Sequence, residues 1–422
     1  MSLVSFLTCD VAGVARGRSV PVADLDRRLE SGLGWVPANQ SLTPFGHIVE
    51  ANPFDSFGDL RLIPDAATRA TADIGAGIAP FDVVLCDITH TDGSAWECCP
   101  RAFLADALAE LHELAGVEVM ASFEHEFVLH SNEPPPHPFS LIAQRRAEPF
   151  GSLLVEALNE AGCEVETFLP EYGPHQFEVP TAPVVGVAAA DRSVLVKELV
   201  REVAFRVGRS VSFSPKLSAD GTGNGAHIHM SLISADGGSA LFDPHGPARL
   251  STLGASFCAG ILRHLPALLP LTCGSVISYE RLGPHHWSSA GAYLAEGDRE
   301  AALRLAGTPS TDGSDEAGSF NVEYRPSDAT ANPYLALGAI VRAGAAGIRD
   351  GLAAPTLGPA GAADPLPTSL DDALEAFEAD ATVREFLSPK FRECFVGVKR
   401  EEIRFCADRS ADETYALYAA AY

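Results

Sequence analysis

Residues 117–129 read VEVMASFEHEFVL and alternate between apolar and polar side chains with a period of two. This period predicts a β-strand with Glu124 and Glu126 on one face and Phe123 and Phe127 on the other. Two carboxylates this close on one face repel each other unless a cation lies between them. The strand therefore belongs to a sheet with one buried face, whose acidic face either holds a cation or is simply solvated.

The composition bounds the class of protein. The chain has 422 residues, 46% of them hydrophobic, which is enough for two or three domains with buried cores. Its 30 basic and 56 acidic residues leave a net charge of −26, which opposes binding to nucleic acid or to an anionic membrane surface. There is no apolar run of about 18 residues and no signal-peptide pattern, so we expect a cytoplasmic protein.

Cysteine and lysine usage narrows the chemistry. The nine cysteines form no CxxC pair and are expected to be reduced and mostly buried, without a zinc site. Lysine occurs at only four positions, so arginine supplies nearly all of the positive charge. A site for a carboxylate or a phosphate should therefore be built from arginine, whose guanidinium makes forked contacts with such anions.

Periodicity and turn residues predict an α+β chain. Short strands are expected in the first hundred residues at Leu3–Leu7, Ser41–Ile48 and Phe81–Ile88. Helices are expected from Pro100 to Gly116 and at 151–161, 190–207, 249–269, 332–350 and 369–380, and a loop at Ala353–Pro367. We place the domain boundary between residues 1–97 and 98–422.

Two further segments carry polar residues on predicted strands. In 170–179, PEYGPHQFEV, Gln176 and Glu178 share a face after a Gly-Pro turn. In 221–231, GTGNGAHIHMS, a glycine-rich loop leads into a strand on which His227 and His229 share a face. No Gly-Lys-Ser/Thr follows, so the loop is not a Walker loop, and a flexible loop beside two ordinary histidines is the alternative.

Three arginine segments complete an ordered set of motifs. They are Ser278–Pro284, Asp298–Arg304 and Asn321–Pro326, and each alone is compatible with surface ion pairs. In chain order the set is Asp10-x-x-Gly13-x-x-Arg16-Gly17, residues 61–65 (RLIPD), Cys99-Pro100-Arg101, the ExE strand, the HxH loop, RL-P, R-x4-R, E-x-R-P and residues 331–334 (ANPY). This order resembles the glutamine synthetase superfamily, and it covers most of the chain.

The resemblance implies a fold and a set of site residues. The fold is a β-grasp-like N-terminal domain followed by a catalytic domain with a curved antiparallel sheet. One divalent cation, Mg²⁺ or Mn²⁺, would be held by Glu126, Glu171 and Glu178, and a second by Glu124, His227 and Glu323. ATP would be bound by His229, Ser231, Arg299 and Arg304, with Arg299 also catalytic, and the glutamate substrate by Gly223, Arg281 and Arg325.

The sequence departs from the family where ammonium is handled. The flap glutamate six residues beyond the RL-P arginine is Trp287 here, which cannot accept a proton but offers a cation–π face. The Asp-Gly-Ser-Ser segment that supplies an acid from the neighbouring subunit is unmatched, and only Glu30 stands nearby. Thr222 replaces an asparagine of the glycine loop, and Gly318–Asn321 replace basic residues, so contacts to glutamate and phosphate are expected to differ.

These departures favour an amine larger than ammonia. We expect an ATP-dependent ligase that joins the γ-carboxylate of glutamate to a polyamine, ethanolamine or alkylamine through a γ-glutamyl phosphate. A true glutamine synthetase and a noncatalytic assembly protein of the same family are the alternatives. By resemblance the chain should form a homo-oligomeric ring, a dodecamer or a hexamer.

Overall fold

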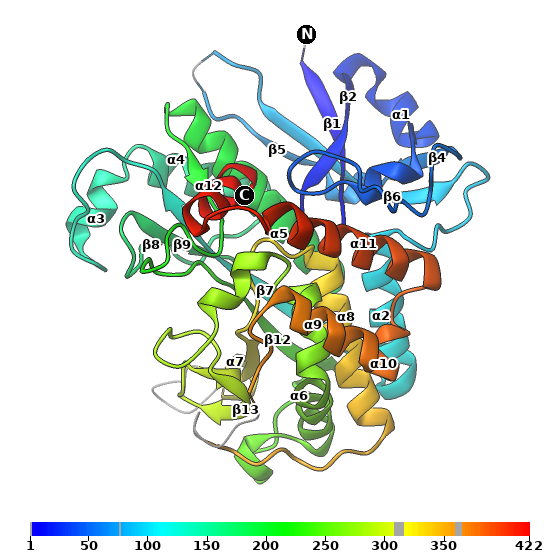
Figure 1. Cartoon of the computed structure of the whole chain (residues 1–422), viewed down its shortest axis with the longest axis vertical. Helices are drawn as coiled ribbons and strands as arrows, with labels where there is room; N and C mark the ends of the chain where they lie inside the picture. Colours follow the sequence, from blue (N-terminus) through cyan, green and yellow to red (C-terminus); the bar gives the residue numbers. More distant parts are fainter. Residues whose placement is uncertain (1, 76, 308–315, 359–364) are drawn as a thin grey trace.

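The N-terminal part of the chain is a small mixed sheet (Figure 1). In this computed structural model, which describes residues 2–75, 77–307, 316–358 and 365–422, the strand order is β2-β1-β6-β4-β3, with β5 also paired to β6. The strands are β1 (Leu3–Cys9), β2 (Ala15–Pro21), β3 (Leu33–Trp35), β4 (Leu60–Pro64), β5 (Ala70–Ala72) and β6 (Phe81–His90). β1 runs parallel to β6, and helix α1 (Leu25–Ser31) packs beside β4. This confirms the β-grasp-like prediction.

The predicted strand at Ser41–Ile48 is wrong. The segment begins at the end of a 3₁₀ helix (Pro37–Ser41) and then turns, with Thr43 N–H donating to the His47 carbonyl at 2.9 Å. Gly46 adopts a φ of 90°, a conformation that a strand residue does not take. The turn residues Pro44 and Gly46 therefore outweigh the apolar alternation.

The second sheet carries the ExE strand at its centre. Its order is β13-β14-β15-β12-β7-β9-β8, and the short β10 and β11 also pair with β7. Its strands are β7 (Val117–Leu129), β8 (Leu169–Pro170), β9 (Gln176–Pro180), β10 (Val184–Val185), β11 (Val211–Ser212), β12 (Ala226–Ser234), β13 (Gly291–Glu296), β14 (Ala301–Ala306) and β15 (Asn321–Tyr324). All of these pairings are antiparallel, as predicted for this sheet, except that of β13 with β14, which is parallel.

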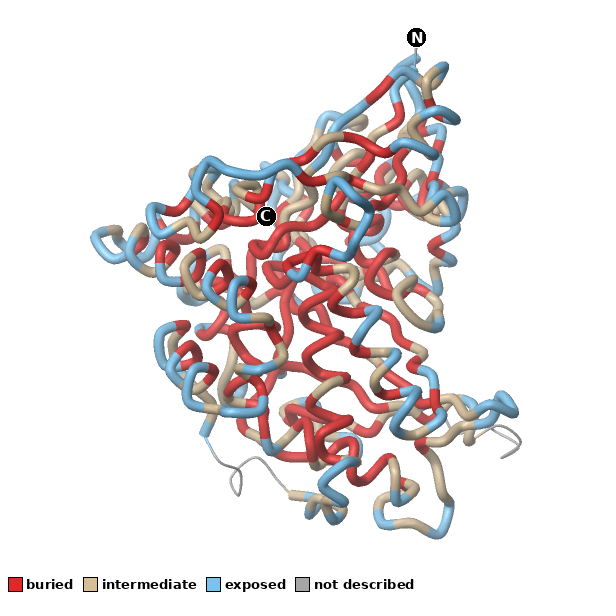
Figure 2. The backbone as a smooth tube through the Cα atoms, turned by 90° about the vertical axis from the view of Figure 1, so that its right-hand side faces the viewer, coloured by how far each residue is buried: buried red, intermediate tan, exposed pale blue. Residues whose placement is uncertain are grey.

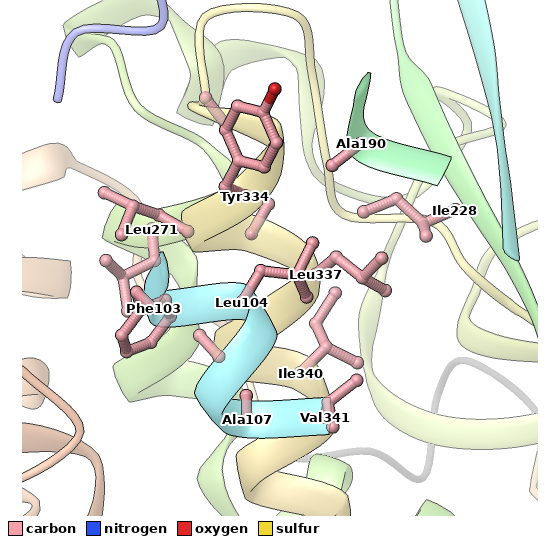
Figure 3. Packing of buried hydrophobic residues seen from close by; sticks show 14 of the residues in the cluster. Phe103, Leu104, Ala107, Ala190, Ile228, Leu271, Tyr334, Leu337, Ile340 and Val341 are labelled. Carbon is pink, nitrogen blue, oxygen red and sulfur yellow. The ribbon is translucent and has the colours of Figure 1, made fainter. Parts of the chain in front are cut away.

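Helices cover the apolar side of this sheet (Figure 1). Helices α2 (Pro100–Ala115), α5 (Ala188–Arg206) and α6 (Thr252–Thr272) contact its strands, and α8 (Pro333–Arg349) packs on all three of these helices. Farther from the sheet, α9 (Leu370–Ala379) packs on α6, α10 (Ala381–Arg384) packs on α9, and α4 (Phe150–Glu160) packs on α5. Of the two short helices, α3 (Leu141–Arg146) lies against β8, and α7 (Glu316–Ser319) precedes β15. In Figure 3, Leu104 and Ala107 of α2 face Leu337, Ile340 and Val341 of α8. The buried backbone is concentrated in this interior, and the exposed residues lie at the periphery (Figure 2). The helical core therefore packs against the apolar face of β7.

Helix ends follow the chemistry seen in the sequence. Gly116 ends α2 in the left-handed conformation, and the Ser369 side chain accepts from Asp372 N–H at the start of α9. Within the described residues, α6 alone is long and apolar enough to cross a membrane, but 67% of its most apolar window is buried and it packs on α8 and α9. We read α6 as a core helix.

The two sheets are joined by buried polar contacts. Arg101, on α2, forms ion pairs with Asp65 and Asp87 of the first domain and with Asp191 of α5. Asn332 donates to the carbonyls of Cys9 and Asp10, at 3.1 and 2.8 Å. Helices α11 (Pro389–Cys406) and α12 (Ala411–Ala421), which our sequence reading did not predict, pack against both halves (Figure 1). The predicted division after residue 97 stays a prediction.

Candidate active site

Strand register brings the polar residues of five strands together. Glu124 on β7 stands opposite His227 on β12, and Glu126 stands opposite Glu178 on β9. On the other side, Glu323 of β15 pairs with His229 of β12 and with Arg304 of β14. Because side chains of paired residues lie on the same face of a sheet, the ExE, HxH and E-x-R motifs form one cluster.

Glu171, a loop residue, joins the two carboxylates of Glu126 and Glu178. Glu171 follows β8 and hydrogen-bonds to Glu178, so this pair adjoins Glu126 through β9. Glu126 is held by Gly225 N–H at 2.8 Å, and Gln176 lies 3.4 Å from the same carboxylate while also donating to the Gly223 carbonyl at 2.8 Å. Gln176 thus ties the glycine loop to the carboxylates, a role that our sequence reading missed although it placed Gln176 on the right face.

Both histidines face the carboxylates. His227 Nδ1 lies 3.5 Å from Glu323 Oε1 and 3.7 Å from Glu124 Oε2. His229 Nε2 lies 3.2 Å from Glu124 Oε1, and its Nδ1 is 2.8 Å from the Asn321 side chain. Within the part of the chain that the structure describes, one group of donor atoms lies close enough to hold a metal ion: Glu124, His229 and Glu323, within 4.8 Å of one another. Our choice of His227 as the ligand stays a prediction.

The pKa values of the carboxylates indicate that positive charge is scarce around Glu171 and Glu178. Burial, together with the charges of Glu124 and Glu126, raises the pKa of Glu178 to about 10. Burial also raises the pKa of Glu171. Burial opposes the ionised form of Glu124 too, but hydrogen bonds from His227 and His229 hold the pKa of Glu124 well below its usual range. Without a cation, these buried acids must bind protons to reduce the repulsion between their charges. A divalent cation bound between them would reduce the same repulsion.

The residues present therefore fit the implied metals. Carboxylate oxygens suit a hard divalent ion, and His229 Nε2 lies beside them, 3.2 Å from Glu124 Oε1. A bound cation would supply charge neutralisation to these acids and to phosphate oxygens. The ligand sets themselves remain predictions.

Arginines line the same face. Arg304 and Arg325 both form ion pairs with Glu323, whose side chain is fully buried. Arg299 is exposed, and its charge acts on Glu171. A side chain at Gly223 would collide with the Arg281 side chain, so glycine is required where the loop crosses this arginine. Arg281, one of the two arginines predicted to bind the glutamate substrate, therefore lies against the glycine loop.

The side chains of three further predicted residues make no hydrogen bond or ion pair to the acidic cluster that the structure shows among its described residues. Trp287 is 71% exposed on the loop after Arg281, although its carbonyl accepts from Arg325 at 2.8 Å. Glu30 is exposed on α1, beside the N-terminal sheet and distant from β7 and β12 (Figure 1). Ser231 is buried, and its hydroxyl donates to the Phe320 carbonyl at 2.9 Å. Within a single chain, Glu30 is therefore not close to the acidic cluster.

Comparison with known proteins identifies the family. The glutamine synthetase catalytic domain matches residues 97–418, and the glutamine synthetase N-terminal domain matches residues 1–96. The chain belongs to the glutamine synthetase family. This confirms the resemblance, the fold class and the prediction of a ligase.

Relatives within this family carry the names of different activities. A gamma-glutamylpolyamine synthetase of Streptomyces coelicolor is 35% identical over 93% of this chain and 88% of its own length. A glutamate–isopropylamine ligase of a Pseudomonas species is 28% identical over 94% and 90%. A solved structure described as a novel glutamine synthase homolog is 43% identical, with a TM-score of 0.93 over 100% of this chain and 98% of that one.

Proposed function

We propose that this protein is an ATP-dependent ligase that joins the γ-carboxylate of glutamate to an amine other than ammonia. The observation that carries the proposal is Trp287, an exposed indole at the position where the family's flap places a carboxylate. An indole offers apolar area and a cation–π face to an alkylammonium group, but no proton acceptor. The similarity to a polyamine synthetase and to an isopropylamine ligase supports the same reading.

The arginine and acidic groups divide the work. Arg281 and Arg325 hold the carboxylates of glutamate, and Arg299 and Arg304 hold the phosphates of ATP, with Arg299 neutralising the phosphoryl group as it moves. His229 and Ser231 contact the nucleotide side. Glu124, Glu126, Glu171, Glu178, His227 and Glu323 would hold two divalent cations, whose charge would neutralise the phosphates. Little covalent chemistry is left to the protein, because phosphoryl transfer depends on positioning and charge.

An amine screen tests the proposal. Phosphate release with ATP, Mg²⁺ and glutamate should be stimulated more by putrescine, spermidine, ethanolamine or methylamine than by ammonium. If ammonium gives the highest kcat/KM, the protein is a glutamine synthetase with a rebuilt ammonium site, an activity that several relatives at 27–30% identity carry by name.

We also propose a ring assembly in the cytoplasm, with the active site shared between subunits. The support is the position of Glu30, which is exposed and distant from the acidic cluster of its own chain (Figure 1). Sedimentation should give a hexamer or a dodecamer. Co-assembly of a Glu30→Ala chain with a Glu126→Ala chain should restore part of the activity that each variant lacks, roughly a quarter for random mixing.

A further inference from the structure

Arg281 and Arg325, the two arginines proposed to bind glutamate, donate hydrogen bonds to the loop that carries Trp287. Arg281 Nη1 donates to the Ser288 hydroxyl at 2.8 Å. Arg325 Nη2 donates to the Trp287 carbonyl at 2.8 Å, and its Nε lies 3.3 Å from the Ser288 carbonyl. Ser288 is only 2% exposed, so its hydrogen bonds with the two arginines are shielded from water.

Other contacts keep both arginines in place without the loop. Arg281 Nη2 donates to the Ser327 carbonyl at 2.8 Å. Arg325 Nε also donates to the Arg299 carbonyl at 2.8 Å, and its Nη1 pairs with Glu323. The Ser288 and Trp287 contacts are therefore additional to those that orient the guanidinium groups, and they occupy donors that a carboxylate would take.

The loop itself is held under backbone strain. His285 and Trp287 have φ values of 67° and 53°, in the left-handed region that non-glycine residues seldom adopt. His285 N–H donates to Glu300 Oε1 at 2.5 Å, and Gly283 N–H donates to the Ser289 carbonyl at 2.9 Å. Such a conformation persists only while its contacts last, so loss of the arginine contacts would favour a different one.

We propose that Ser288 is a latch between the glutamate site and the amine site. Resting on the proposed glutamate function, the inference is that a glutamate carboxylate displaces the Ser288 hydroxyl from Arg281 and the Trp287 carbonyl from Arg325. A carboxylate makes the stronger, charge-assisted bond, so the exchange favours substrate. The loop with Trp287 is then released from both arginines. Ser288 is thus a positioning residue that acts through Arg281.

The latch predicts an increase in affinity on removal of a hydrogen bond. In Ser288→Ala, Arg281 Nη1 is left unsatisfied in the free protein, so glutamate loses a competitor. Calorimetry on the full-length protein should give a Kd for glutamate about 2- to 12-fold lower than in wild type, which is the net value of one hydrogen bond. Ser289→Ala is the matched control, because the Ser289 hydroxyl is buried and has no hydrogen-bond partner among the residues that the structure describes. Its Kd should equal that of wild type.

Tryptophan fluorescence provides a second readout. Trp35 and Trp96 are 6% and 4% exposed, so Trp287 is the tryptophan that responds to movement of this loop. Glutamate should change the emission of wild type but not that of Trp287→Phe. An unchanged or raised Kd in Ser288→Ala, or unchanged emission in wild type that binds glutamate by calorimetry, overturns the latch alone. Absence of glutamate binding in wild type overturns the proposed function and the latch together.

Discussion

At the residue scale, the acidic cluster is built for ligands and contributes little to the core. Glu126→Ala and Glu178→Ala should abolish turnover with Mg²⁺ but leave the folded protein at least as stable, because each removes a repelling carboxylate from the metal-free cluster. Burial and the charges of Glu124 and Glu126 together hold the pKa of Glu178 far above its usual range. Thermal unfolding and phosphate release measure the two effects. A variant that fails to fold, or that keeps near-normal activity, would contradict the metal assignment.

Trp287 belongs to the same scale and decides the choice of amine. Trp287→Glu should raise use of ammonium and lower use of an apolar amine, because a carboxylate accepts a proton and binds a small cation whereas an indole does not. One such contact changes selectivity by roughly 10- to 200-fold in the ratio of kcat/KM values. Trp287→Phe keeps an aromatic wall and serves as the control. Equal amine preference in wild type and Trp287→Glu would remove the main support for a substrate other than ammonia.

At the scale of elements, Asn332 connects a helix end to the other domain. Its side chain accepts from Tyr334 and Leu335 N–H at the start of α8 and donates to two carbonyls at the end of β1. Asn332→Ala should lower the free energy of unfolding by about 2–4 kcal/mol, the sum of a lost cap and of buried carbonyls left unpaired.

Ser369→Ala is the matched control for this prediction, since Ser369 caps α9 and makes no bond to the first domain that the structure shows. It should cost only about 1 kcal/mol. Chemical denaturation measures both variants. Equal losses would mean that the contacts to β1 do not contribute to stability.

At the scale of the whole molecule, Lys197 is a charge buried at the junction of the domains. Its ammonium donates to the Gly13 and Ala329 carbonyls at 3.0 and 2.7 Å. Burial lowers the pKa of Lys197 from 10.5 to about 8. Below pH 8 the folded protein therefore bears the full cost of the buried charge, and this cost is relieved between pH 8 and 10.5, where the unfolded chain binds more protons.

Lys197→Met removes this titration. The stability of wild type relative to Lys197→Met should rise by about 2 kcal/mol between pH 7.5 and 9.5. Urea unfolding at both pH values measures the difference, and comparison of the two proteins cancels the contribution of other groups. A difference that does not change with pH would show that Lys197 keeps an ordinary pKa.

The sequence by itself determined the elements whose signal is local. Alternation placed Glu124, Glu126, Phe123 and Phe127 on the correct faces of β7, and cap residues marked the ends of α2 and α9. The order of motifs was enough to predict the family, because the ordered set is specific although each motif alone is common. The Ser41–Ile48 strand failed because Pro44 and Gly46 make a turn that alternation does not register.

Only the tertiary structure decided which of these residues meet. Strand register sets Glu126 against Glu178 and His229 against Glu323, and register depends on hydrogen bonds between strands far apart in the chain. The same holds for Gln176 on the glycine loop and for Ser288 between the two arginines, whose partners lie 47 and up to 37 positions away. Such contacts arise from packing of the whole chain, because no local periodicity encodes the distance between two side chains on different strands.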